Sequence, residues 1–363
     1  MRSSIFKNKI AMVLTVFMLF VVGGAVLAAC SKKTVNPNVV LITMDKQDEH
    51  WNRVNSGAST AKAAAPDDVT VDYDWLAPAQ AKDEVAQVGL INSAATNGAK
   101  VIILAALNAE GSKSAVEDAM AKGVQFIYVD SPSDAKGAIA TFATDNRVAG
   151  EKAAQKIKDI IDELNGDDDP SNDMTLSGST DVYSLRPDSS PSTLARQDGF
   201  KAKMESLFPG LTVDITGQKL DTPEKAQDFA KTQITNNAKI LFGTNEGTTV
   251  AIGQAIHDEN AKSDGKYVLG AGFDVSDPIT TSINNGDILF TMQQDPNNMG
   301  KLSMELAIKL LKDKDYKPEN TEVDTGSDYY LGTETAQSSQ TQTITFGLFS
   351  ESDVLPIQNN KIA

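Results

Sequence analysis

The sequence has few of the side chains on which most catalytic and metal sites depend. Among 363 residues there are two histidines and one cysteine, and His50 and His257 lie far apart in the chain. A zinc signature cannot be built from this set. Phosphate-binding loops of the GxxxxGK[ST] kind and the GxSxG turn of serine hydrolases are also missing. These absences predict a protein that is not an enzyme and that holds no cofactor and no metal.

Basic side chains are scarce as well. The chain has 33 Lys and Arg against 49 Asp and Glu, which gives a formal net charge of −16 at pH 7. Binding to nucleic acids needs a basic footprint that neutralises phosphates, and only Lys32 and Lys33 offer anything of that kind. We therefore expect no nucleic-acid partner. The abundance of acids also means that no particular carboxylate pair marks a glycosidase.

The amino terminus has the pattern of an export signal. Residues 1–9 are basic and residues 10–29 contain no charged side chain, which is typical of a signal peptide. The rival interpretation, an uncleaved membrane anchor, needs about 20 apolar residues. The small residues Leu27–Ala29 directly before Cys30 resemble the lipobox of bacterial lipoproteins. This resemblance implies cleavage before Cys30 and lipidation of its sulfur.

Lipidation of Cys30 implies a location at the extracellular face of the cell membrane, and retention by lipid favours an envelope of the Gram-positive type. We expect residues 1–29 to be the signal peptide and residues 30–37 to be a lipidated tether. The body that follows has no cysteine left for a disulfide. Its stability must therefore come from a buried core.

From Asn38 onward, short apolar runs alternate with amphipathic segments. We expect strands at 39–43, 69–73, 101–104, 124–129, 174–176, 212–215, 239–242, 267–270 and 287–291, and helices at 81–97, 115–122, 148–164 and 299–312. Apolar strands separated by helices predict parallel sheets covered on both faces, hence an α/β fold. The roughly 320 residues after the tether fit two domains.

Several segments, taken in their order and spacing, resemble the periplasmic sugar-binding proteins of the ribose and galactose type, the substrate receptors of ABC importers. They are His50-Trp51, Val129-Asp130, Ala143–Asn146, Ala195–Phe200, Phe242–Glu246, Gly272–Asp274 and Thr291–Pro296. The resemblance extends from about Asn38 to Lys312.

It implies two Rossmann-like domains with parallel sheets, joined by a three-segment hinge, as in type I periplasmic binding proteins. The amino-terminal lobe would comprise residues 38–145 and 294–341, and the carboxy-terminal lobe residues 146–293 and 342–363. Ligands bind at the carboxyl ends of the strands in such open sheets.

The resemblance implies ligand contacts for eight residues. A sugar offers an apolar face to an aromatic ring and a belt of hydroxyls to carboxylates, amides and guanidinium groups. The eight are Asp48, His50, Trp51, Asp130, Arg196, Asn245, Asp274 and Gln294.

Other roles stay open for some of them. Trp51 could be a core aromatic, Asp274 could cap the next helix, and Arg196 could be a surface residue paired with an acid. Asp145-Asn146, at the first expected crossover, is better interpreted as structural, and His257 as a surface or partly packed residue.

Two departures from the ribose-type pattern bear on the ligand. Ser131 stands where close members have an arginine, and residues 219–223 lack the aromatic that stacks from the second domain. These departures favour a less flat ligand, such as a polyol, a furanose-derived signal of the autoinducer-2 kind or a modified sugar.

The sequence thus predicts an extracellular substrate-binding lipoprotein that works as a monomer. It captures a small carbohydrate in an interdomain cleft and delivers it to the transmembrane subunits of an ABC permease. The alternative is a receptor that presents its ligand to a membrane sensor. The acidic loop 166–173 lacks the glycine and terminal glutamate of an EF-hand, so both a cation site and a solvated loop stay open. The role of residues 318–340 also stays open.

Overall fold

The computed structural model describes residues 36–166, 173–215, 219–260 and 268–318, together with strands at 330–333, 340–344 and 347–350. The expected signal peptide, Cys30, most of the tether and most of the segments 166–173 and 318–340 lie outside these residues. Within the described part of the chain, no helix is both long and apolar enough to cross a membrane.

The first domain is built on a seven-stranded sheet in the order β10-β11-β5-β4-β3-β1-β2. All neighbours pair in parallel except β10 and β11. The strands are β1 (Val39–Ile42), β2 (Tyr73–Leu76), β3 (Val101–Leu104), β4 (Gln125–Val129), β5 (Ala140–Thr144), β10 (Tyr330–Thr333) and β11 (Gln340–Ile344).

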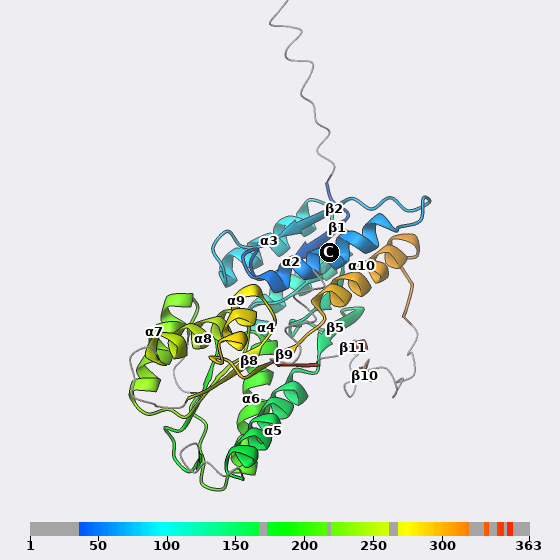
Figure 1. The fold of residues 1–363 in the computed structure, drawn as a ribbon. Helices are drawn as coiled ribbons and strands as arrows, with labels where there is room; N and C mark the ends of the chain where they lie inside the picture. The colour runs from blue at the N-terminus through cyan, green and yellow to red at the C-terminus, as the bar shows by residue number, and fades with distance from the viewer. Residues whose placement is uncertain are drawn as a thin grey trace, which may run out of the picture. The chain divides into compact units, whose positions relative to one another are not determined.

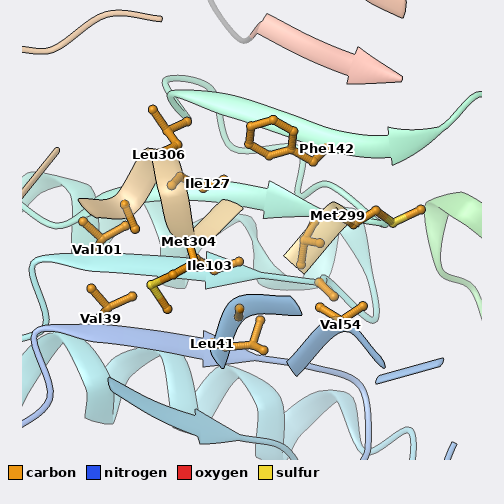
Figure 2. Close-up of a cluster of buried hydrophobic side chains, with 14 of the residues drawn as sticks. Val39, Leu41, Val54, Val101, Ile103, Ile127, Phe142, Met299, Met304 and Leu306 are labelled. Carbon is orange, nitrogen blue, oxygen red and sulfur yellow. The ribbon is translucent and has the colours of Figure 1, made fainter. Parts of the chain in front are cut away.

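Helices cover both faces of this sheet, as its near-continuous apolar strands require. Alternate side chains of β1 point to opposite faces: Val39 and Leu41 pack with α2 (Glu49–Ala63) and α10 (Pro296–Lys312), whereas Val40 and Ile42 pack with α3 (Glu84–Thr96) and α4 (Ala109–Ala121). Figure 2 shows the first of these two cores, in which Val54 of α2 and Met299, Met304 and Leu306 of α10 lie against strand residues.

The second domain is built on a five-stranded sheet in the order β12-β9-β8-β7-β6, with β12 antiparallel at the edge. Helices α5 and α6 pack on one face and α7, α8 and α9 on the other. The elements are α5 (Asn146–Leu164), β6 (Val182–Leu185), α6 (Pro191–Leu207), α7 (Pro223–Thr235), β7 (Ile240–Gly243), α8 (Glu246–Asn260), β8 (Leu269–Phe273), α9 (Asp277–Asn284), β9 (Phe290–Gln293) and β12 (Gly347–Ser350). The predicted α/β fold with parallel sheets in two domains is confirmed.

The chain passes between the two sheets after β5, after β9 and between β11 and β12. The expected final boundary between residues 341 and 342 falls inside β11 and is corrected by the strand register. Because β11 stays paired with β5 as far as Ile344, the passage comes after that residue.

Three expected strands are also placed differently. A strand was expected at 69–73, but the chain pairs with β1 only from Tyr73 onward. Val69 and Val71 pack against the core from the loop before that strand. Residues 174–176 are not a strand, since Met174 and Leu176 fill the second core without joining the sheet, which begins with β6. The segment 212–215 contributes only a single bridge to the sheet.

Helices α2 and α10 lie side by side in the first domain (Figure 1). Their backbones touch at two glycines: a methyl group on Gly57 would overlap the carbonyl oxygen of Asn297, and one on Gly300 would overlap that of Val54. This close packing fixes the position of α2, whose first turn carries His50 and Trp51.

Candidate ligand-binding site

A cavity of about 290 Å³ lies where the carboxyl ends of strands from both sheets face each other. This is the place at which open α/β sheets bind ligands. The lining residues are Met44, Asp48, His50, Trp51, Lys82 and Asp130 from the first domain, and Asp188, Ser190, Ser192, Thr193, Arg196, Asn245, Asp274 and Gln294 from the second domain and the crossover that follows β9.

All eight residues singled out from the sequence line this cavity. Trp51 belongs both to the cavity and to the first core, where its side chain is 3% exposed. Its indole N–H has no hydrogen-bond partner within the described part of the chain. A buried donor left without a partner costs free energy, so this N–H is available to an acceptor in the cavity.

Asp130 and Asp274 occupy equivalent places in the two domains. Asp130 follows β4 and Asp274 follows β8, and both adopt the left-handed conformation, with φ of 61° and 72°. Each backbone N–H donates to the next strand, to the carbonyl of Phe142 in one case and of Met292 in the other, both at 2.9 Å. Left-handed backbone at residues other than glycine is strained and concentrates at functional sites.

His50 lies between these two aspartates. Its Nε2 is 3.2 Å from Asp130 Oδ2 and its Nδ1 is 3.7 Å from Asp274 Oδ1, as ion pairs that are not aligned as hydrogen bonds. Burial alone lowers the pKa of His50, but the two carboxylates raise it to about 10. Burial likewise opposes ionisation of Asp130 and Asp274, and the charges of His50 and Arg196 hold both pKa values below the usual range. The imidazolium therefore links the two domains at neutral pH.

Arg196 is a fully buried residue of α6, and the surface role considered for it is wrong. Its guanidinium donates to Asn146 Oδ1 at 2.8 Å, to the carbonyl of Thr244 at 2.9 Å and to Gln294 Oε1 at 2.6 Å. It also lies over the ring of Phe273, 4.3 Å from the centroid. Asn146 thus has the structural role that was expected for it.

Gln294 and Asn245, which also line the cavity, are held in place by hydrogen bonds. Gln294 Nε2 donates to Asp274 Oδ1 at 2.7 Å, and Asp274 Oδ2 accepts the backbone N–H of Glu246 at 3.0 Å. Asp274 therefore caps α8 and not the next helix, α9. Asn245 Oδ1 accepts from the backbone N–H of Thr248 at 3.1 Å. His257 is 60% exposed and pairs with Asp287 outside the cavity.

Sequence reasoning missed Lys82 and the hydroxyl cluster formed by Ser190, Ser192 and Thr193. Lys82 Nζ is 3.0 Å from Asp45 and 3.8 Å from Asp188 of the other domain, and these charges raise the pKa of Lys82 above its usual range despite burial. The cluster follows β6 in a run rich in serine and threonine. The position of these hydroxyl residues after an apolar strand was the sequence signal that could have identified them as lining the cavity.

The two departures from the ribose-type pattern have structural counterparts. Ser131 Oγ donates to Asp130 Oδ1 at 2.9 Å and can accept from the hydroxyl of Ser192, whose Oγ lies at 2.7 Å, and the second contact joins the domains directly. Where the structure describes it, the second domain contributes hydroxyl, carboxyl, amide and guanidinium groups to the cavity lining, but no aromatic ring. Across the described residues, no group of three or more His, Cys, Asp or Glu side chains is placed to hold a metal ion.

Fold and cavity together are those of a two-domain binding protein. A family model described as a periplasmic binding protein domain matches residues 39–315. The chain belongs to this family, so the resemblance stated from the sequence is confirmed. Its members are substrate-binding proteins, which agrees with the prediction that the chain is not an enzyme.

Solved structures with the same fold include solute-binding proteins of carbohydrate transporters and a protein in complex with autoinducer-2 (AI-2). A carbohydrate transporter solute-binding protein from Agrobacterium radiobacter, in complex with D-arabinose, has 20% identity and a TM-score of 0.71, with 91% of this chain and 98% of that chain covered. An ABC transporter solute-binding protein from Agrobacterium vitis with bound D-fucose has 20% identity and a TM-score of 0.71, with 89% and 97% covered. LsrB from Clostridium saccharobutylicum, in complex with AI-2, has 16% identity and a TM-score of 0.72, with 88% and 98% covered.

Proposed function

We propose that this protein is an extracellular substrate-binding lipoprotein that captures a monosaccharide or related polyol between its domains and delivers it to an ABC permease. The observation that carries the proposal is the cavity, which combines one buried indole with a dense set of hydrogen-bonding groups from both domains. These are the groups that a small polyhydroxylated molecule needs.

Binding and domain closure are coupled by the same side chains. Asp130 and Asp274 come from different domains, yet both can accept from hydroxyls of one ligand, while Trp51 offers its ring to the apolar face. A ligand that contacts both domains binds the closed arrangement more tightly than any open one, and this difference in affinity drives closure. A permease can then recognise the closed form.

The location of the protein in the cell envelope is part of the proposal. The short match around Cys30 supports lipidation and retention beside the permease, in a cell envelope of the Gram-positive type. A Cys30→Ala variant should appear in the growth medium with its ligand affinity unchanged. Continued membrane attachment of that variant would contradict the lipid anchor.

A ligand panel tests the binding function. Purified protein is heated with aldopentoses, aldohexoses, deoxyhexoses and hexitols, each at millimolar concentration. A ligand at about one hundred times its Kd stabilises the native state by about 2.7 kcal/mol, which raises Tm. An Asn245→Ala variant should lose this response, whereas Lys312→Ala, which breaks only an exposed ion pair with Asp68, should keep it. Absence of any shift across the panel would contradict the proposal.

The alternative, a receptor that presents its ligand to a membrane sensor, draws support from the similarity to an AI-2 complex. Its ligand is tested by adding AI-2 to the same panel. The role is tested by deletion: loss of ligand uptake by the cells supports transport, and loss of ligand-dependent transcription with intact uptake supports sensing.

A further inference from the structure

The hydroxyl cluster of Ser190, Ser192 and Thr193 lines the cavity from the loop after β6 and the first turn of α6, and all three side chains are buried. Ser190 stands at the N-cap of α6, where a serine hydroxyl ordinarily accepts from the backbone of the helix. Within the described residues it makes no such bond. Its hydroxyl is therefore held by a different group.

That group is the carboxylate of Asp188, which takes the protons of two members of the cluster. Asp188 Oδ1 accepts from Ser190 Oγ at 2.7 Å, from Thr193 Oγ1 at 2.9 Å and from the backbone N–H of Ser190 at 3.0 Å. A carboxylate can only accept, and each hydroxyl has a single proton. Hydrogen bonds to an ionised acceptor are also the strong ones. Both hydroxyl protons are thus used within the protein.

The proton of the third hydroxyl is used in the same way. Ser192 Oγ and Ser131 Oγ lie 2.7 Å apart, and Ser131 gives its own proton to Asp130 Oδ1 at 2.9 Å. Because Ser131 has no second proton, the hydrogen between the two serines belongs to Ser192. Asp188 and Asp130 together account for every proton of the cluster, which keeps only lone pairs for a ligand.

We propose that the hydroxyl cluster selects the ligand by accepting hydrogen bonds only, and that Asp188 sets this polarity. A ligand group placed against the cluster must then be a donor, such as a sugar hydroxyl. A fluorine or a methoxy oxygen at the same place would set lone pair against lone pair and leave buried acceptors without a partner, which is unfavourable. The inference rests on the proposed carbohydrate-binding function and narrows it to ligands with a hydroxyl that donates to the cluster.

Deoxyfluoro sugars test this polarity, because fluorine is close to a hydroxyl in size but cannot donate. Isothermal titration calorimetry compares the carbohydrate that binds best in the panel with its deoxyfluoro and deoxy analogues at each hydroxyl position. We expect at least one position at which both analogues bind tenfold or more weakly than the parent, since a site built to pair with a hydroxyl rejects analogues that lack the bond. The fluoro analogue should be no tighter there than the deoxy analogue.

An Asp188→Asn variant separates polarity from shape. The ammonium of Lys82 lies 3.8 Å from Asp188 Oδ2 and favours the amide oxygen at that position. The amide NH2 then faces Ser190 and Thr193 and donates to them, which releases their protons toward the ligand. The ratio of parent to fluoro affinity should therefore fall toward one. Asp162→Asn removes the same charge from an exposed site on α5 and should leave the ratio unchanged.

Two further variants keep the test decisive if Asp188→Asn does not fold, which its Tm shows. Thr193→Val and Ser192→Ala each remove one acceptor without adding a donor. In at least one of them the parent should lose affinity while its fluoro analogue does not. An unchanged ratio in folded Asp188→Asn, or in both hydroxyl variants, would overturn the inference and leave the carbohydrate function standing. So would a wild-type ratio near one at every position. Failure of every carbohydrate to bind would overturn both.

Discussion

In the first domain the chain leaves β4 through Asp130, and in the second it leaves β8 through Asp274, with the same left-handed backbone and the same hydrogen bond to the next strand. The helix packing is matched as well. Gly57 and Gly300 bring α2 and α10 into backbone contact, and Gly150 and Gly199 do the same for α5 and α6, which also lie side by side in Figure 1.

The two domains differ in what this shared framework presents to the cavity. The first domain supplies Trp51, His50 and Lys82, whereas the second supplies Arg196 and a cluster of hydroxyl and amide groups. Among the described lining residues, aromatic rings therefore come from the first domain only. The shared framework thus places one carboxylate after a strand in each domain, whereas the other residues that follow the strands differ between the domains.

The largest expected effect comes from Arg196→Ala in the second domain. Loss of the guanidinium leaves acceptors on Asn146, Thr244 and Gln294 without their buried donor. Removing one member of a buried charged network typically costs about 3–5 kcal/mol. Urea denaturation should show that loss, together with loss of ligand binding. Wild-type stability in this variant would mean that the network does not hold the second domain in place.

The next effect concerns His50, which ties the first domain to Asp274 of the second. Because its pKa rises from 6.5 to about 10 on folding, the stabilisation is complete below pH 6.5 and declines as pH approaches 10. His50→Gln should cost about 3 kcal/mol at pH 6, because removing one partner of a buried ion pair leaves the facing carboxylates uncompensated. The difference from wild type should shrink in urea titrations at pH 8 and pH 9.5. A difference that grows with pH would contradict a protonated His50.

The matched glycines test whether the two domains use the same packing device. Gly57→Ala and Gly150→Ala each force a methyl group into backbone of the facing helix, and overpacking of this kind costs about 1–3 kcal/mol. Gly89→Ala on α3 meets no atom within 4 Å and should instead stabilise the protein slightly. Thermal denaturation of the three variants measures this. A neutral effect in one domain only would break the equivalence.

The smallest effect is expected at the direct bridge between the domains. Ser131→Ala removes the hydroxyl that is hydrogen bonded to Asp130 and to Ser192. A net contribution of about 0.5–1.5 kcal/mol is typical of one hydrogen bond, so ligand affinity should fall several-fold while Tm without ligand changes little. Unaltered affinity would show that this contact does not support the closed form.

Much of this site could be predicted because apolar runs in the sequence show where strands end. Asp130, Asn245 and Asp274 each follow an apolar run, and parallel strands present their carboxyl ends at one edge. Lys82 was missed because its loop enters the cavity through contacts with Asp45 and Asp188, which local pattern does not encode.

The strand at 174–176 was expected for a related reason. Buried apolar side chains mark the core in a loop as well as in a strand, so Met174 and Leu176 were assigned to the sheet. Only the pairing of β6 with β7 shows where the sheet begins. Hydrophobic pattern therefore located the core of the second domain but not the edge of its sheet.

One fluorescence titration tests most directly the central claim that a small carbohydrate binds between the domains against Trp51. The chain has two tryptophans, and Trp75→Phe leaves Trp51 as the single reporter. Trp75 lies in β2, outside the cavity lining, so the variant should bind as wild type does. Saturation with a carbohydrate found in the panel should change the emission of Trp51 with the same Kd as calorimetry. Binding with unchanged emission would place the ligand elsewhere and contradict the account.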